Sequence, residues 1–281
     1  MEIKFHQSPN TFIGNVQIRV ENLERSLDFY TKVIGCTVLE RSESNAVLGS
    51  GQVPLLTLEQ PKDAIPKQRR TTGLYHFALL LPSRAELGKF LRHIIEIGYP
   101  LGAADHLVSE ALYLDDPDGN GIEVYTDRPS SDWSWSGNEV EMTTKQIDAE
   151  GILAEAGGEK WVGLPVGTIM GHIHLHVADL NKAKQFYGDG LGFHIVSRYP
   201  QALFMSTGGY HHHLGLNTWN GVGAPPPEEN SAGLKQFELV FPGEVERSKA
   251  AGKLKDMGIE VSGDFLVKDP SGNVIQLSTQ G

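Results

Sequence analysis

The sequence predicts an α+β protein made of four similar modules, and two internal repeats carry this prediction. Residues 20–30 (VENLERSLDFY) recur as residues 177–187 (VADLNKAKQFY). Residues 116–123 (DPDGNGIE) recur as residues 269–276 (DPSGNVIQ). Because a recurring segment marks a recurring structural unit, these four segments indicate four units that each combine helix and strand.

The first repeat predicts a helix in each copy. A short strand pattern precedes it, and Asn22 and Asp179 stand where an N-cap side chain accepts hydrogen bonds from the first turn. The aromatic pairs 29–30 and 186–187 fall on the apolar face of these helices. We therefore expect both pairs to pack in the core.

The second repeat predicts a hairpin. Asp, Pro, Gly and Asn crowd residues 116–121, which is typical of a tight turn. The flanking residues 112–114 and 122–125 have strand character, so Tyr113 lies on one arm and Glu123 on the other. A buried glutamate here needs a cation or a metal as its partner. A solvent-facing glutamate on a half-exposed strand fits the periodicity equally well.

Each module follows the order strand, helix, then two or three strands, over about 50 residues. We predict an N-terminal half at residues 12–128, a linker at 129–167 with a helical patch near 145–156, and a C-terminal half at 168–281. The modules themselves cover residues 12–60, 73–128, 168–220 and 233–280.

Composition and charge limit the class of protein. The chain has 281 residues, of which 40% are hydrophobic and 21% charged, as is ordinary for a globular protein. A net charge of −11 with scattered Lys and Arg argues against nucleic acid or an anionic membrane as a partner. No run approaches the roughly 18 apolar residues of a membrane span, and the first residues lack a signal-peptide pattern. The one cysteine, Cys36, excludes a disulfide framework and a cysteine-based zinc site, so we expect a cytoplasmic protein.

The repeats, their order and the hairpin motif together resemble the vicinal oxygen chelate superfamily, which includes glyoxalase I, bleomycin-resistance proteins and type I extradiol dioxygenases. The four-module layout is similar to that of bacterial enzymes of the catechol 2,3-dioxygenase type, and the resemblance covers nearly the whole chain. It implies two cupped mixed sheets, each made by two βαβββ modules. It also implies one divalent metal, held on the first and last strands of paired modules.

Three residues match the metal-ligand positions of this family. The first ligand opens a strand in the pattern H-x-x-L-x-V-x-D, which residues 172–179 (HIHLHVAD) reproduce. His76 occupies the same position in the second module, and Glu123 closes the last strand of that module. The resemblance therefore implies His76, Glu123 and His172 as ligands. Two histidines and one carboxylate suit non-haem Fe(II), with Mn(II) or another divalent metal as alternatives.

The remaining ligand positions hold the amides Asn15, Gln236 and Gln276, which bind divalent transition metals poorly. The three matching residues can meet only if the second and third modules pair across the linker. The first and fourth modules would then form a cup without a metal.

The histidines of the third module also indicate a polar cavity. His172, His174 and His176 alternate, so all three face one side of their strand. Three histidines on one face are hard to explain as apolar core, although a single strand histidine such as His76 is more often structural than a ligand.

One long motif favours dioxygenases within the superfamily. His106, Tyr113 and Glu123 match the extradiol dioxygenase signature, and Ala104 is its one departure. The resemblance implies that Tyr113 hydrogen-bonds a bound substrate oxygen. It implies that His106 steadies the substrate hydroxyl or its ring.

A run of histidines points the same way. Residues 208–217 (GGYHHHLGLN) resemble a strand of extradiol enzymes whose second histidine is the acid–base residue, which implies that role for His212. In a regular strand His211 and His213 point away from the face of His212, whereas a bulge exchanges the two faces. A solvated strand edge is the alternative interpretation.

The resemblance implies an extradiol ring-cleaving dioxygenase that acts on a catechol- or hydroquinone-type aromatic with Fe(II) and O2. A metal-dependent isomerase or lyase of the glyoxalase kind is one alternative, but it needs a second carboxylate where the third module has Gly215. A non-catalytic binding or resistance protein is another, and an intact ligand set argues against it. A homo-oligomer is compatible with the family. We interpret Tyr75, Phe204 and Trp219 as core residues rather than pocket lining.

Overall fold

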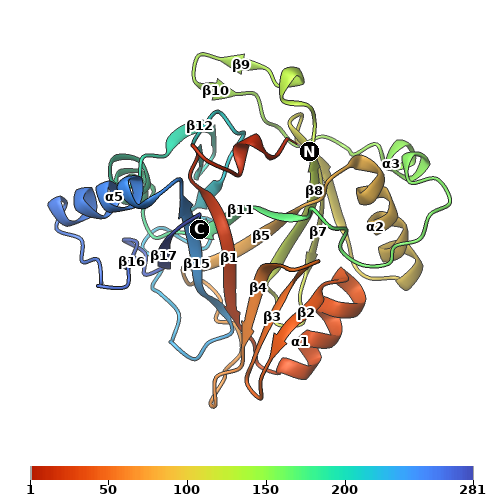
Figure 1. Ribbon diagram of the computed structural model, residues 1–281, viewed down its shortest axis with the longest axis horizontal. Helices are drawn as coiled ribbons and strands as arrows, with labels where there is room; N and C mark the ends of the chain where they lie inside the picture. The colour runs from red at the N-terminus through yellow and green to blue at the C-terminus, as the bar shows by residue number, and fades with distance from the viewer. Residues whose placement is uncertain (1, 281) are drawn as a thin grey trace.

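Two mixed β-sheets, flanked by helices, make up the protein in a computed structural model that describes residues 2–280 (Figure 1). One sheet has seven strands in the order β16-β17-β15-β1-β4-β3-β2. Its strands are β1 (Phe12–Arg19), β2 (Thr37–Arg41), β3 (Asn45–Ser50), β4 (Val53–Glu59), β15 (Gly233–Phe241), β16 (Leu266–Lys268) and β17 (Val274–Thr279).

The other sheet has eight strands in the order β12-β13-β14-β11-β5-β8-β7-β6. Its strands are β5 (Gly73–Leu80), β6 (Gly102–Asp105), β7 (Ser109–Asp115), β8 (Gly121–Asp127), β11 (Ile169–His176), β12 (His194–Tyr199), β13 (Ala202–Ser206) and β14 (Leu214–Asn217). The two sheets meet through their central strands, because β1 contacts β11.

In each module a helix connects the first strand to the rest: α1 (Leu23–Phe29), α2 (Arg84–Ile97), α4 (Leu180–Lys184) and α5 (Glu244–Asp256). The π-helical turns η2 (Tyr30–Ile34) and η4 (Gln185–Gly190) follow α1 and α4. The 3-10 turn η1 (Ile3–Phe5) precedes β1, and the 3-10 turn η3 (Ser130–Asp132) and α3 (Ala149–Glu155) belong to the linker. This order confirms the predicted α+β fold. The π-helical turns that follow α1 and α4 were not predicted, because the spacing of apolar residues does not distinguish a π-helical turn from an α-helical one.

The strand pairing joins modules from opposite halves of the chain. In the seven-stranded sheet, β1 of the first module pairs antiparallel with β15 of the fourth. In the eight-stranded sheet, β5 of the second module pairs antiparallel with β11 of the third. The predicted pairing of the second and third modules across the linker is therefore confirmed.

The predicted N-caps are both present. Asn22 Oδ1 accepts a hydrogen bond from Arg25 N at 2.9 Å at the start of α1. Asp179 Oδ1 accepts from Asn181 N and Lys182 N at 2.8 and 3.1 Å at the start of α4. These bonds satisfy amide groups that have no partner within the helix.

The two sequence repeats meet each other in space. The Tyr30 hydroxyl, which ends the first helix motif, donates to Asp116 Oδ2 at 2.8 Å in the turn between β7 and β8. The Tyr187 hydroxyl donates to Asp269 Oδ2 at 2.9 Å in the corresponding turn before β17. All four residues are buried. Each bond links the helix of a module in one sheet to a turn of the other sheet, so the repeated motifs hold the sheets together.

The linker lies against the eight-stranded sheet. Its helix α3 packs on α2 and coincides with the predicted helical patch, and its short hairpin pairs β9 (Trp135–Ser136) with β10 (Glu139–Val140). Lys145 forms an isolated bridge with Asp105 at the end of β6. The linker therefore reaches the edge of the sheet that carries the site.

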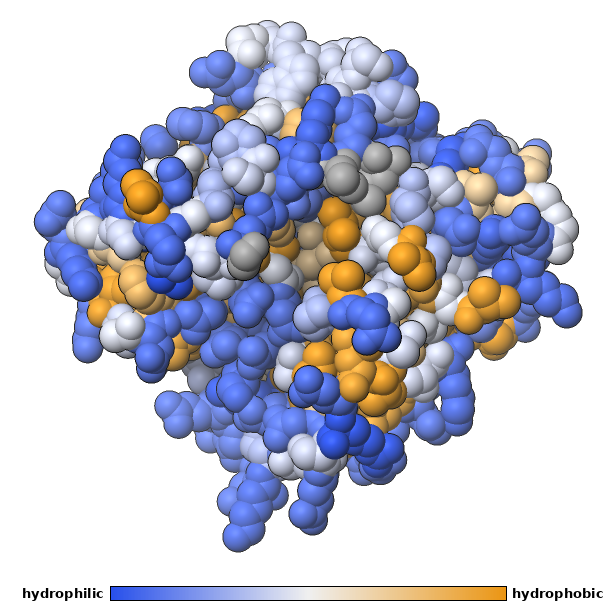
Figure 2. Space-filling model, in the orientation of Figure 1, coloured by the Kyte–Doolittle hydropathy of each residue, from blue (hydrophilic) through white to orange (hydrophobic). Residues whose placement is uncertain are grey.

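The visible face of the molecule is mostly hydrophilic, with hydrophobic residues in separate patches (Figure 2). Within residues 2–280, no helix has the length and apolar character needed to cross a membrane.

Candidate metal and active site

Three strands of the eight-stranded sheet bring the predicted metal ligands together. Glu123 on β8 and His172 on β11 are both in register with Ala78 on β5, so they lie in one row across the sheet. The methyl side chain of Ala78 leaves room for the two to meet above it. His76 lies two residues before Ala78 and so points to the same face.

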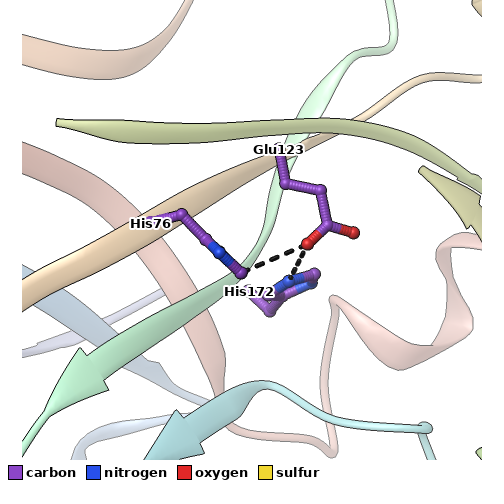
Figure 3. Close-up of side chains that lie close together, drawn as sticks. All are labelled: His76, Glu123 and His172. Atoms are coloured by element: carbon purple, nitrogen blue, oxygen red, sulfur yellow. Dashed lines mark hydrogen bonds and ion pairs between the residues drawn. The ribbon is translucent and has the colours of Figure 1, made fainter. Parts of the chain in front are cut away.

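Ligand atoms of the three side chains lie within 4.8 Å of one another (Figure 3). Glu123 Oε2 is 3.1 Å from His172 Nε2 and 3.2 Å from His76 Nε2. All three residues are buried. We refer to His76, Glu123 and His172 as the triad.

The protonation of the triad suits metal binding. Burial alone would raise the pKa of Glu123, but His172 and His76 outweigh burial and hold this pKa well below its usual range. Burial lowers the pKa of His172, which favours the neutral ring. His76 Nε2 is buried, and its 3.2 Å ion-pair contact with Glu123 Oε2 does not have the geometry of a hydrogen bond. A metal binds an ionised carboxylate and the lone pair of a neutral imidazole, so the directions at Glu123 and His172 favour metal binding.

Two members of the triad, His76 and Glu123, line a cavity of about 340 Å³. Its wall is mostly aromatic and apolar and contains no Lys or Arg among the described residues. The lining residues are Tyr75, His76, Ala104, His106, Ser109, Tyr113, Glu123, Met142, Thr143, Thr144, His174, Tyr199, Phe204, His212 and Trp219.

His106 and Tyr113 form a hydrogen-bonded pair in this wall. Tyr113 lies opposite Glu123 in the β7–β8 ladder and therefore shares its face. His106 Nδ1 donates to Thr143 O at 2.8 Å, so its Nε2 accepts from the Tyr113 hydroxyl at 2.6 Å. Burial, followed by the charge of Glu123, raises the pKa of Tyr113 well above its usual value. The phenol therefore stays protonated, and His106 orients it.

The three consecutive histidines point in different directions. They lie in a bend before β14 rather than in the expected strand. His212 lines the cavity, with its ring centroid 4.1 Å from that of His172. His211 Nε2 donates to Asp127 Oδ1 at 2.8 Å, and His213 Nε2 donates to Phe5 O at 3.0 Å. All three are buried, so the solvated-edge interpretation is wrong.

His174 forms a further part of the wall. The amide N–H of Trp219 and the His176 ring both donate to Asn217 Oδ1, at 3.0 and 2.7 Å, which fixes the orientation of the Asn217 amide. Asn217 Nδ2 therefore donates to His174 Nε2 at 3.0 Å. A Cβ atom at Gly215 would overlap the His174 ring. This explains why glycine stands where a glyoxalase-like site needs a carboxylate.

Several lining residues were not predicted. Tyr75 and Trp219 line the cavity and are 41% and 43% exposed, so our interpretation of them as core residues is wrong. Phe204 lines the cavity and also packs against a buried hydrophobic cluster. Met142 and Thr144 come from the linker, whose path across β6 and β7 has no signal in the sequence.

The fold agrees with comparisons to known proteins. The family model of the glyoxalase/bleomycin resistance protein/dioxygenase superfamily matches residues 12–124 and 169–277. The chain therefore belongs to this superfamily.

Particular relatives refine this assignment. Over 270 residues the chain is 51% identical to Catechol-2,3-dioxygenase of Bacillus subtilis (strain 168), which covers 93% of this chain and 94% of the relative. It is 29% identical over 116 residues to Biphenyl-2,3-diol 1,2-dioxygenase 3 of Rhodococcus globerulus, covering 38% of this chain and 61% of the relative. Glyoxalase I from Zea mays shares the fold, with a TM-score of 0.57, 17% identity, and coverage of 95% of this chain and 92% of the other.

Proposed function

We propose that this protein is an extradiol dioxygenase that cleaves a catechol ring beside its two hydroxyl groups, with Fe(II) and O2. One observation carries the proposal: a buried cluster of two histidines and one carboxylate borders an aromatic cavity whose wall also holds His212. The 51% identity to Catechol-2,3-dioxygenase over most of both chains supports it.

His76, Glu123 and His172 would hold the iron. When bound, Fe(II) supplies a Lewis acid that lowers the pKa of a substrate hydroxyl and a redox centre for O2. Three protein ligands leave coordination positions open for small molecules. The His174 ring over Gly215 keeps a fourth protein ligand out of this side of the site.

His212 accepts the proton that the substrate hydroxyl loses. The bond from His211 Nε2 to Asp127 selects the tautomer with the hydrogen on Nε2, and in that tautomer His211 Nδ1 accepts from His212 Nδ1 at 2.8 Å. His212 Nε2 then keeps its lone pair for the substrate. Burial and the neighbouring histidines lower the pKa of His212 well below its usual value, which keeps the free ring neutral. After the ring has opened, the same nitrogen returns this proton to the product.

Tyr113 and His106 orient the substrate. The Tyr113 hydroxyl gives its hydrogen to His106, so its oxygen lone pairs accept a hydrogen bond from the substrate hydroxyl that keeps its proton. The aromatic wall excludes water, which strengthens these polar contacts. The ring opens by breaking the carbon–carbon bond next to the diol, and both atoms of O2 enter the product.

The wall also limits the substituents of the catechol. A carboxylate on the ring would be buried near Glu123 without a Lys or Arg partner in the described lining. We infer that the substrate is a neutral catechol.

The test is anaerobic purification, loading with Fe(II), addition of catechol, and then admission of air while the yellow ring-fission product is followed. We expect product with the iron-loaded protein. Variants His76→Ala and His172→Ala should lose both iron and product.

His194→Ala is the matched control, because His194 is an exposed histidine of β12 outside the cavity. It should keep both iron and activity. Iron retained at full stoichiometry by His172→Ala would contradict the ligand assignment. Tight iron binding without ring cleavage of any catechol would contradict the dioxygenase.

A further inference from the structure

A second cavity adjoins the substrate cavity at Tyr75, which lines both. The second cavity has a volume of about 630 Å³ and is bordered by the segment 66–72, by residues of the turn after β7, and by His176 and Asn220. Tyr75 is the only residue common to both linings as the structure describes them. The Tyr75 side chain is therefore the partition between the two spaces.

A β-bulge places Tyr75 in this position. His76 pairs with His174, and Leu74 pairs with Leu175, so Tyr75 is the extra residue between the two pairs. A bulge re-aims a side chain that regular alternation would send to the opposite face. Tyr75 consequently reaches the same cavity as His76.

Ring contacts hold the partition in place. The Tyr75 ring lies edge-on to His174 and to Trp219, with centroid separations of 4.9 and 5.3 Å, and 5.0 Å from the His76 ring. Aromatic rings in such edge-to-face arrangements stabilise one another. His174 is itself fixed by Asn217, so the partition rests on a rigid neighbour.

We propose that Tyr75 is a specificity-determining residue that limits the size of the ring substituent on the catechol. This inference rests on the proposed function for the identity of the ligand. With Tyr75 in place, a substrate is confined to the smaller cavity. Without its ring, the two cavities join, and an aryl substituent gains room that catechol itself does not use.

The experiment measures dissociation constants by calorimetry on the Fe(II)-loaded protein under argon, so binding is read without turnover. The ligands are catechol, 3-phenylcatechol and 4-phenylcatechol, all neutral to suit the wall. In Tyr75→Ala we expect the ratio of phenylcatechol to catechol dissociation constants to fall by about tenfold or more for at least one isomer, as pocket enlargement does for a bulkier ligand. Tyr75→Phe keeps the ring and should keep the wild-type ratio.

Tyr199→Ala is the matched control. Tyr199 is also a half-exposed tyrosine of the substrate cavity, but it does not line the second cavity. Its removal should leave the ratio within about threefold of wild type. If Tyr75→Ala does not fold, Tyr75→Val, which suits a strand, takes its place.

An unchanged ratio in a folded Tyr75→Ala variant overturns the proposal, as does an equal fall in Tyr199→Ala. The proposed function fails separately: catechol that binds but is not opened in air contradicts the dioxygenase, while the ratio still tests the partition. Wild-type protein that binds no catechol overturns both.

Discussion

Hydrogen bonds decide which ring nitrogens of the clustered histidines are free for chemistry. Asp127 accepts the hydrogen of His211 Nε2, and His211 Nδ1 in turn accepts the hydrogen of His212 Nδ1, so His212 Nε2 keeps a lone pair. Asn217 acts on His174 in the opposite sense, because it occupies Nε2 and leaves Nδ1 with the hydrogen. Two similar side chains of one cavity are thus given different roles by their partners.

Replacement of His212 tests the acid–base role. We expect His212→Gln to lower kcat for catechol about 10²- to 10⁴-fold, because the glutamine amide cannot take up the hydroxyl proton. The dissociation constant of catechol, measured without oxygen, should change little, since the triad is intact. A loss confined to binding, with kcat retained, would contradict the role.

His6 gives the stability of the protein a pH dependence. It is buried, and burial lowers its pKa from 6.5 to about 4, while its Nε2 donates to Gly171 O at 2.9 Å. On acidification the His6 ring of the unfolded chain therefore takes up a proton near pH 6.5, whereas the buried ring of the folded protein takes it up only near pH 4. The free energy of unfolding should fall by about 2 kcal/mol between pH 7 and pH 5 from this residue alone.

The measurement is urea unfolding of chelator-treated wild type and His6→Gln at several pH values. The wild type should lose stability more steeply on acidification than the variant, which has no titrating group at this position. Parallel curves would exclude His6 as the source.

At the scale of elements, each helix motif is hydrogen-bonded to a turn motif through a buried tyrosine and a buried aspartate. The buried carboxylates of Asp116 and Asp269 each accept backbone and side-chain amide hydrogens from their own turn as well as the tyrosine hydroxyl. The two repeated motifs therefore form one structural clasp that occurs twice, and its four bonded residues, Tyr30, Asp116, Tyr187 and Asp269, do not line the substrate cavity.

Removal of a clasp hydroxyl should destabilise the fold without changing the site. We expect Tyr30→Phe and Tyr187→Phe to lower the free energy of unfolding by about 1–3 kcal/mol each, because a buried carboxylate loses a partner. Tyr99→Phe is the control: the Tyr99 hydroxyl bonds Asp115 O near the surface, so its loss should have a much smaller effect. Iron content per folded protein should stay unchanged in all three variants.

The sequence predicted those elements whose signals are local. Asn22 and Asp179 cap their helices as expected, and the turn chemistry of residues 116–121 placed Glu123 opposite Tyr113. The expected strand at residues 211–213 is a bend instead. The conformation of this segment depends on hydrogen bonds from the His211 and His213 rings to Asp127 and Phe5. These partners are distant in the sequence, so no local pattern reveals them.

At the scale of the whole molecule, the sequence predicted more of the site than of its surroundings. The triad could be located because each member matches a motif, and its convergence dictated which modules pair. Tyr75 could not be placed in the wall, because a bulge reverses its face and bulges depend on pairing register. The linker residues Met142 and Thr144 were missed because nothing in their own sequence fixes the path of the linker.

Metal removal should weaken the whole fold. The triad joins β5, β8 and β11, so iron binds the folded chain and not the unfolded one. At free iron about 100 times its dissociation constant, binding adds about 2.7 kcal/mol to the free energy of unfolding. Chelation should lower the melting temperature of the wild type and of His194→Ala but leave that of His172→Ala unchanged. An equal decrease in His172→Ala would show that the chelator acts elsewhere.

The pairing of β1 with β15 and of β5 with β11 also governs how the chain is made. The ribosome synthesises the first two modules before β15 and β11, so one edge of β1 and one edge of β5 stay unpaired until synthesis continues. Such edges pair readily with another chain. Two nascent chains held close together can therefore exchange halves and mature as an intertwined dimer. The rate at which the second half follows the first decides between that exchange and sheet pairing within one chain.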